Sequence, residues 1–130
     1  MREQLSRRCE SPGIEAVRVL REVASALAYA HSMDIVHRDI KPDNVLLSHG
    51  SAMVTDLGVA KALNASGNTG TGLTALGSTL GTPAYMSPEQ VSADPTLDHR
   101  SDIYSWGVMA YELLSGSTPF TGRNPQAPLA

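Results

Sequence analysis

The chain has 130 residues, 42% of them hydrophobic, which is enough for one modest globular domain with a real core. A net charge of −3 gives no support to a nucleic-acid or membrane-surface partner, and Cys9, the single cysteine, excludes an intrachain disulfide. No signal peptide or run of about 18 apolar residues is present, so we expect a cytoplasmic protein without a membrane segment.

The first predicted element is an amphipathic helix that ends near His31. It begins at Ser11, the expected N-cap, with Pro12 at the first helical position. Apolar residues then recur at spacings of three or four, which predicts one buried stripe formed by Val17, Leu20, Val23, Leu27 and Ala30.

Three short apolar runs of strand-like length follow this helix: DIVH (34–37), NVLL (44–47) and AMVTD (52–56). The segment SHGS, residues 48–51, predicts a hairpin turn between the last two runs. From Asn64 to Pro83 the chain is rich in Gly, Thr, Ser and Asn, which indicates a long loop.

A second helix is expected to begin near Ser101 and to end before Gly116. Its apolar residues are Ile103, Trp106, Met109, Ala110 and Leu113, and Trp106 is interpreted as a core residue. The predicted order is therefore helix, short strands, long loop, helix.

The segment HRDIKPDN, residues 37–44, concentrates the side chains that phosphoryl transfer requires. That chemistry needs a carboxylate to orient the attacking hydroxyl, a cation to balance the phosphoryl charge, and oxygen ligands for magnesium. Asp39 can supply the carboxylate, Lys41 the cation and Asn44 a metal-binding oxygen. A hairpin after Asn44 would bring Asp56 back beside it as a second metal ligand.

Four motifs occur in order along the chain: HRDIKPDNVLL, TDLGVAK, GTPAYMSPEQ and SDIYSWGVMAYELLSGSTPF. Together they resemble the eukaryotic-type Ser/Thr protein kinases in the form that many bacteria carry. The resemblance covers residues 1–122 as a partial kinase domain and leaves residues 123–130 as a Pro-rich tail or truncation end. It implies an α+β, mainly helical fold that is part of the C-terminal lobe of a kinase. It also implies ATP and Mg²⁺ as cofactors and a protein substrate with Ser or Thr hydroxyls.

The resemblance assigns the chemical roles residue by residue. Asp39 matches the catalytic aspartate, and Lys41 matches the lysine that faces the transferred phosphate of ATP. Asn44 and Asp56 match the magnesium ligands that hold the nucleotide phosphates.

Four further positions match regulatory or structural residues of the family. Arg38 precedes the catalytic aspartate, as in kinases controlled by phosphorylation of the activation loop, and Thr82 matches a threonine that contacts the catalytic aspartate and lysine. Glu89 matches the glutamate that closes the activation segment, and Asp102 the aspartate that braces the catalytic loop from the next helix. Two departures are mild: Leu57 replaces the usual Phe, and SPE replaces APE at 87–89.

Several motifs have a plainer interpretation. His37 is more readily structural than a general base, and the four histidines with one cysteine show no zinc-ligand spacing. GTGLTA, residues 70–75, matches a dinucleotide-binding pattern, but the required strand and helix do not flank it. The loop hydroxyls belong either to a solvated loop or to phosphoacceptors: Thr69, Thr71, Thr74, Ser78 and Thr79.

The kinase phosphate-covering Gly-rich loop, strand lysine and adenine hinge have no match ahead of the first helix. We therefore expect the N-terminal lobe and the last helices to be missing. This chain alone should then be inactive, and it should need the missing lobe or a partner for stability. The main interpretation is a Ser/Thr kinase that acts within a complete domain. The alternative is a non-catalytic kinase fragment that acts as a binding or decoy module.

Overall fold

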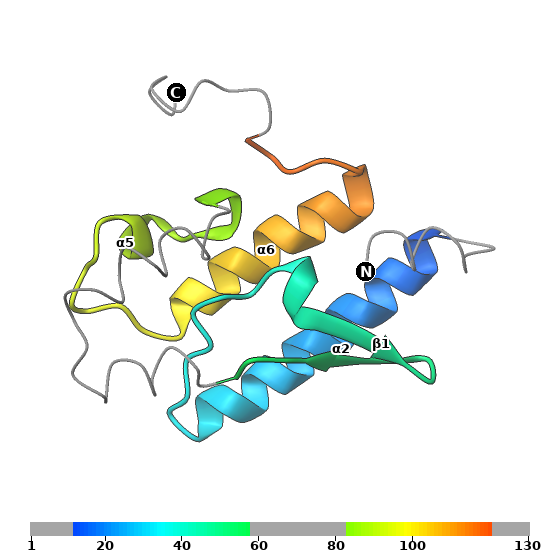
Figure 1. Ribbon diagram of the computed structural model, residues 1–130, viewed down its shortest axis with the longest axis horizontal. Coiled ribbons are helices and arrows are strands. Elements are labelled where there is room, and N and C mark those ends of the chain that lie inside the picture. Colours follow the sequence, from blue (N-terminus) through cyan, green and yellow to red (C-terminus); the bar gives the residue numbers. More distant parts are fainter. Residues whose placement is uncertain (1–11, 58–82, 121–130) are drawn as a thin grey trace.

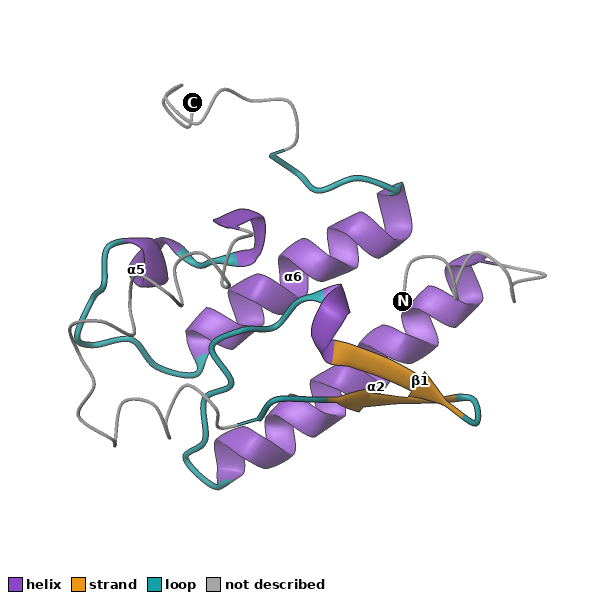
Figure 2. Cartoon of the chain, viewed as in Figure 1, coloured by secondary structure: helices purple, strands orange, loops and turns teal. Residues whose placement is uncertain are grey.

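Two long helices and a β-hairpin form the framework of the protein (Figure 1). The computed structural model describes residues 12–57 and 83–120. The elements are α2 (Pro12–Ser32), the 3₁₀ turn η1 (Pro42–Asn44), β1 (Val45–Ser48), β2 (Ser51–Val54), the 3₁₀ turn η2 (Pro83–Tyr85), α5 (Pro88–Val91) and α6 (Arg100–Ser115). The described residues are thus mainly helical with a small antiparallel sheet, as predicted (Figure 2).

Helix α2 confirms the predicted first helix and buries most of its predicted stripe. Leu20, Val23, Leu27 and Ala30 are buried, but the prediction for Val17 was wrong, because its side chain is 48% exposed. The buried series starts one residue earlier, at Ala16. One residue corresponds to about 100° around a helix, so Val17 points away from that face.

The hairpin β1–β2 confirms the two later strands and the turn between them. Val45 pairs with Val54 and Leu46 with Met53 in an antiparallel register. The turn residues His49 and Gly50 have φ values of 50° and 84°, the two left-handed residues that a type I′ turn requires. On α2, the Glu22 carboxylate accepts a hydrogen bond from the Ala52 backbone N–H at 2.6 Å, which fixes β2 to the helix.

The prediction of a strand at 34–37 was wrong, because these residues belong to no strand of the described chain. Backbone N–H groups of this segment donate to a helix carbonyl and to a side chain instead of to a neighbouring strand. The Ile35 N–H donates to the Ala30 carbonyl at 2.9 Å, and the His37 N–H donates to the Asp102 carboxylate at 2.8 Å. The segment is therefore a connection without regular secondary structure between the end of α2 and the Asp102 side chain of α6.

The core lies between α2, the hairpin and α6. Its buried members are Val19, Leu20, Val23, Leu27, Ile40, Val45 and Met109. Trp106 was interpreted as a core residue; it is partly buried against this cluster, and its indole N–H donates to the Leu20 carbonyl at 3.0 Å. Leu46 and Met53 occupy the opposite face of the hairpin and are about half exposed.

Helix α6 begins at Arg100 and ends at Ser115, close to the predicted limits, with Gly116 in the left-handed conformation at φ 90°. Its buried face is unusually polar. Four of its six buried residues carry polar or charged side chains: Ser101, Asp102, Ser105 and Glu112. No helix among the described residues is long and apolar enough to cross a membrane.

Candidate active site

The loop formed by residues 37–44, here called the 37–44 loop, is bound at its start to Asp102 of α6. The Asp102 carboxylate is 1% exposed and accepts the backbone N–H groups of His37 and Arg38, both at 2.8 Å. It also lies 2.8 Å from Nε2 of His31, near the end of α2. Hydrogen bonds to a charged acceptor are among the stronger ones, so this carboxylate joins two helices and the loop.

His37 is buried and both of its ring nitrogens are engaged by the backbone. Nδ1 accepts the Asp39 N–H at 3.1 Å, so Nε2 carries the proton and donates to the Thr55 carbonyl at 2.7 Å. A general base needs a nitrogen that faces a substrate. The contacts therefore fit the structural interpretation of His37.

Asp39, Lys41 and Asn44 lie together in the 37–44 loop. The Asn44 Nδ2 donates to the Asp39 backbone carbonyl at 2.7 Å and to its carboxylate Oδ2 at 3.0 Å. The Lys41 Nζ lies 3.6 Å from Asp39 Oδ1. These contacts hold the Asp39 carboxylate in place. Because the Asp39 side chain is 33% exposed, the carboxylate is still accessible to a ligand.

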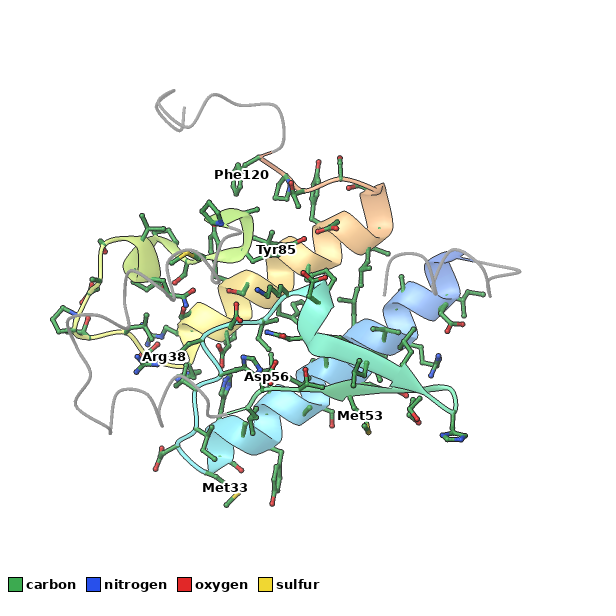
Figure 3. All side chains as sticks on the ribbon, viewed as in Figure 1. Met33, Arg38, Met53, Asp56, Tyr85 and Phe120 are labelled. Carbon is green, nitrogen blue, oxygen red and sulfur yellow. The ribbon has the colours of Figure 1, made fainter. Side chains whose placement is uncertain are left out.

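The hairpin returns the chain to Asn44, so that Asp56 comes one residue after the contact with it. Thr55 donates twice to the Asn44 carbonyl, from its N–H at 2.8 Å and from its hydroxyl at 3.2 Å. Asp56 follows directly, with φ 60°, at the point where the chain leaves β2. Figure 3 labels it together with Arg38, which belongs to the 37–44 loop.

The donor set of these residues fits magnesium. Because the Asn44 amide nitrogen is committed to Asp39, its Oδ1 is left without a hydrogen bond from the described residues. Within 12–57 and 83–120, the Asp56 carboxylate likewise has no hydrogen bond or ion pair. One amide and one carboxylate oxygen match the hard oxygen ligands that Mg²⁺ takes, usually with waters and substrate phosphates. The same part of the chain has no group of three His, Cys, Asp or Glu side chains arranged for a metal.

Other predicted residues are not joined to this cluster. Glu89 lies on α5, and in the described chain its carboxylate forms no ion pair; the same is true of the Arg38 guanidinium. The remaining predicted positions lie outside the described residues: Thr69, Thr71, Thr74, Ser78, Thr79 and Thr82.

A second set of site contacts was not predicted. Residues 83–91, here called the 83–91 segment, are bound to α6 by two contacts. The Ser87 and Ser101 hydroxyls lie 2.7 Å apart, and the Ser105 hydroxyl donates to the Tyr85 carbonyl at 2.6 Å. Its short helix α5 has a capping box formed by Ser87 and Gln90. The sequence carries that signal, since SPEQ combines a capping Ser, a first-turn Pro and a Gln three residues after the Ser.

Comparison with known proteins places this geometry in context. The family described as the protein kinase domain matches residues 1–129. Serine/threonine-protein kinase PknL of Mycobacterium tuberculosis is 49% identical over 123 residues, which cover 94% of this chain and 29% of PknL. Serine/threonine-protein kinase PknB of Mycolicibacterium smegmatis is 41% identical over 113 residues, 86% of this chain and 17% of PknB. The chain thus spans less than a third of the length of these relatives.

Proposed function

The chain belongs to the protein kinase domain family, and we propose that it is part of a serine/threonine protein kinase. The reaction is transfer of the γ-phosphate of ATP to Ser or Thr hydroxyls of a protein substrate. The described elements would then belong to the C-terminal lobe of the kinase fold, as part of a cytoplasmic domain. The comparisons do not favour the alternative of a non-catalytic binding or decoy module.

One observation carries this proposal: the Asp39 carboxylate is partly exposed, yet it is held between the Asn44 amide and the Lys41 ammonium. Phosphoryl transfer depends mainly on positioning and charge stabilisation. A carboxylate with a fixed direction and an open side is suited to orient a substrate hydroxyl.

The proposed roles follow from these contacts. Asp39 accepts the proton of the attacking hydroxyl, and its backbone N–H is held by His37. The Lys41 side chain is 12% exposed, and its ammonium balances the negative charge that the phosphoryl group carries during transfer. Asn44 and Asp56 would hold Mg²⁺, which when bound neutralises charge on the nucleotide phosphates.

The test is phosphate transfer by the protein expressed from its complete gene. We expect Asp39→Asn to abolish transfer from ATP to a protein substrate and to leave nucleotide binding nearly unchanged. Asp43→Asn is a matched control, because Asp43 is an exposed aspartate in the same loop. Equal transfer by Asp39→Asn and the wild type, or equal loss of transfer and nucleotide binding, would refute the role given to Asp39.

A further inference from the structure

We infer that Gln90 is a positioning residue: it holds the peptide bond between Arg38 and Asp39 and so couples helix α5 to the proposed catalytic carboxylate. The inference rests on the proposed kinase function for its catalytic consequence. Its structural part rests on the contacts of the Gln90 side chain alone.

The Gln90 amide joins two segments that are 52 residues apart in sequence. Its Nε2 donates to the Arg38 backbone carbonyl at 2.6 Å, and its Oε1 accepts the Ser87 backbone N–H at 3.0 Å. A carbonyl can only accept and an N–H can only donate, so one orientation of the amide satisfies both partners. The contact is therefore specific to glutamine: glutamate has no donor for the carbonyl at neutral pH.

The contact with Gln90 helps to hold Arg38 in an unfavourable backbone conformation. Its φ of 73° is left-handed, a conformation that costs a non-glycine residue about 1–2 kcal/mol. The N–H of Arg38 is held by Asp102 of α6, and its carbonyl is held by Gln90 of α5. Because that carbonyl and the Asp39 N–H belong to one planar peptide, fixing the first orients the second, which donates to His37.

These contacts close a ring of hydrogen bonds. From Asp102 the ring passes through Arg38 to Gln90, then through Ser87 to Ser101, the neighbour of Asp102 on α6. Ser87, Ser101 and Asp102 are each at most 1% exposed, so water has little access to three of its five members. Gln90 is the only link in this ring between the 83–91 segment and the 37–44 loop. A displacement of the segment is therefore transmitted to the peptide that precedes Asp39.

The experiment compares Gln90→Glu with Ser92→Ala in the complete gene product. The glutamate keeps an oxygen for the Ser87 N–H and thus preserves the cap of α5, but it presents a carboxylate to the Arg38 carbonyl. Ser92→Ala is the control, because Ser92 is exposed at the end of the same helix and its hydroxyl only approaches the Glu89 carbonyl at 3.4 Å.

Two readouts separate positioning from general stability. By hydrogen exchange, we expect the amides of Arg38 and Asp39 in Gln90→Glu to exchange about tenfold faster or more, while amides in the middle of α2 are unchanged. In steady-state kinetics, kcat should fall by about tenfold or more, with KM for ATP within about twofold. Ser92→Ala should match the wild type in both assays.

The outcomes distinguish this inference from the kinase proposal. Unchanged exchange at Arg38 and Asp39 in Gln90→Glu overturns the inference, whatever the activity. So does a uniform rise of exchange across α2 and the loop, which would indicate lost stability only. If the wild-type protein itself shows no transferase activity, the kinase proposal is refuted, and faster exchange at the two amides in Gln90→Glu still supports the coupling.

Discussion

The carboxylate of Asp102 accepts the backbone N–H of Arg38 at 2.8 Å, and Arg38 has a left-handed φ of 73°. A buried charged acceptor on a helix thus holds a loop residue in a conformation that it would otherwise avoid. Strain of this kind persists only where the surroundings fix it. The relationship makes α6 the support of the proposed catalytic loop.

The first prediction concerns Asp102→Asn. The asparagine keeps one acceptor oxygen, but its NH₂ faces a backbone N–H, so at least one charged hydrogen bond is lost. We expect the free energy of local opening at the His37 and Arg38 amides to fall by about 2–3 kcal/mol, measured by native-state hydrogen exchange. Asp98→Asn is the control, since the Asp98 side chain is 49% exposed. Equal effects of the two substitutions would contradict the prediction.

The second prediction distinguishes the role of the Asn44 amide nitrogen, which donates to Asp39, from that of its oxygen, the proposed magnesium ligand. Asn44→Asp keeps an oxygen for magnesium but removes the donor to Asp39, whereas Asn44→Ala removes both. Both variants should lose phosphate transfer by about a hundredfold or more. Only Asn44→Ala should need a higher magnesium concentration for half-maximal nucleotide binding, measured by titration with fluorescent ATP. The same magnesium requirement in both variants would argue against Oδ1 as a ligand.

The third prediction concerns the hairpin turn and is independent of function. Gly50 has φ 84°, so Gly50→Ala should destabilise the hairpin by about 1 kcal/mol. His49→Asn should stabilise it by a few tenths of a kcal/mol, because Asn-Gly is the preferred type I′ pair. Exchange of the hairpin amides measures both changes. Faster exchange in His49→Asn would mean that the Ser48–His49 side-chain contact at 3.0 Å matters more than the turn preference.

The fourth prediction concerns pH. The Thr96 hydroxyl, with a smaller effect of its backbone N–H, lowers the pKa of Asp94 below its ordinary value of 3.8. The folded state therefore favours the charged form. The resulting stability is present above the unfolded pKa and is lost as the pH falls through the folded pKa. Thr96→Val should raise the pKa of Asp94 toward 3.8, as measured by NMR titration of its carboxyl carbon. A pKa equal to that of the wild type would show that the backbone N–H alone sets it.

The fifth prediction concerns regulation. Among the described residues the Arg38 guanidinium has no carboxylate partner, and a phosphate of about −1.5 to −2 charge is a suitable one. We expect active protein to carry phosphate on at least one of Thr69, Thr71, Thr74, Ser78 and Thr79. Mass spectrometry of the active protein is the measurement, with Asp39→Asn as the control for self-phosphorylation. An active protein unmodified over 69–79 would refute the prediction.

The sequence was sufficient to predict the elements whose apolar periodicity, turn residues or terminal glycine agree with the way the elements pack in the fold. The stripe of α2, the His49-Gly50 turn and Gly116 after α6 were sufficient to predict two helices and a hairpin. The run at 34–37 failed, because apolar content does not reveal that the Asp102 carboxylate, 65 residues away, takes the His37 N–H. The ring through Gln90 was missed for the same reason: it depends on side-chain contacts between distant segments.

The contact between Glu22 and Ala52 has a consequence for association with other chains. A two-stranded ribbon has two open edges, and an outward N–H on an edge strand invites pairing with a strand from another molecule. On β2 the outward N–H of Ala52 is already bound by the Glu22 carboxylate. An added strand would have to displace a charge as well as water. The helix that supports the hairpin thereby also opposes the pairing of a foreign strand with the β2 edge.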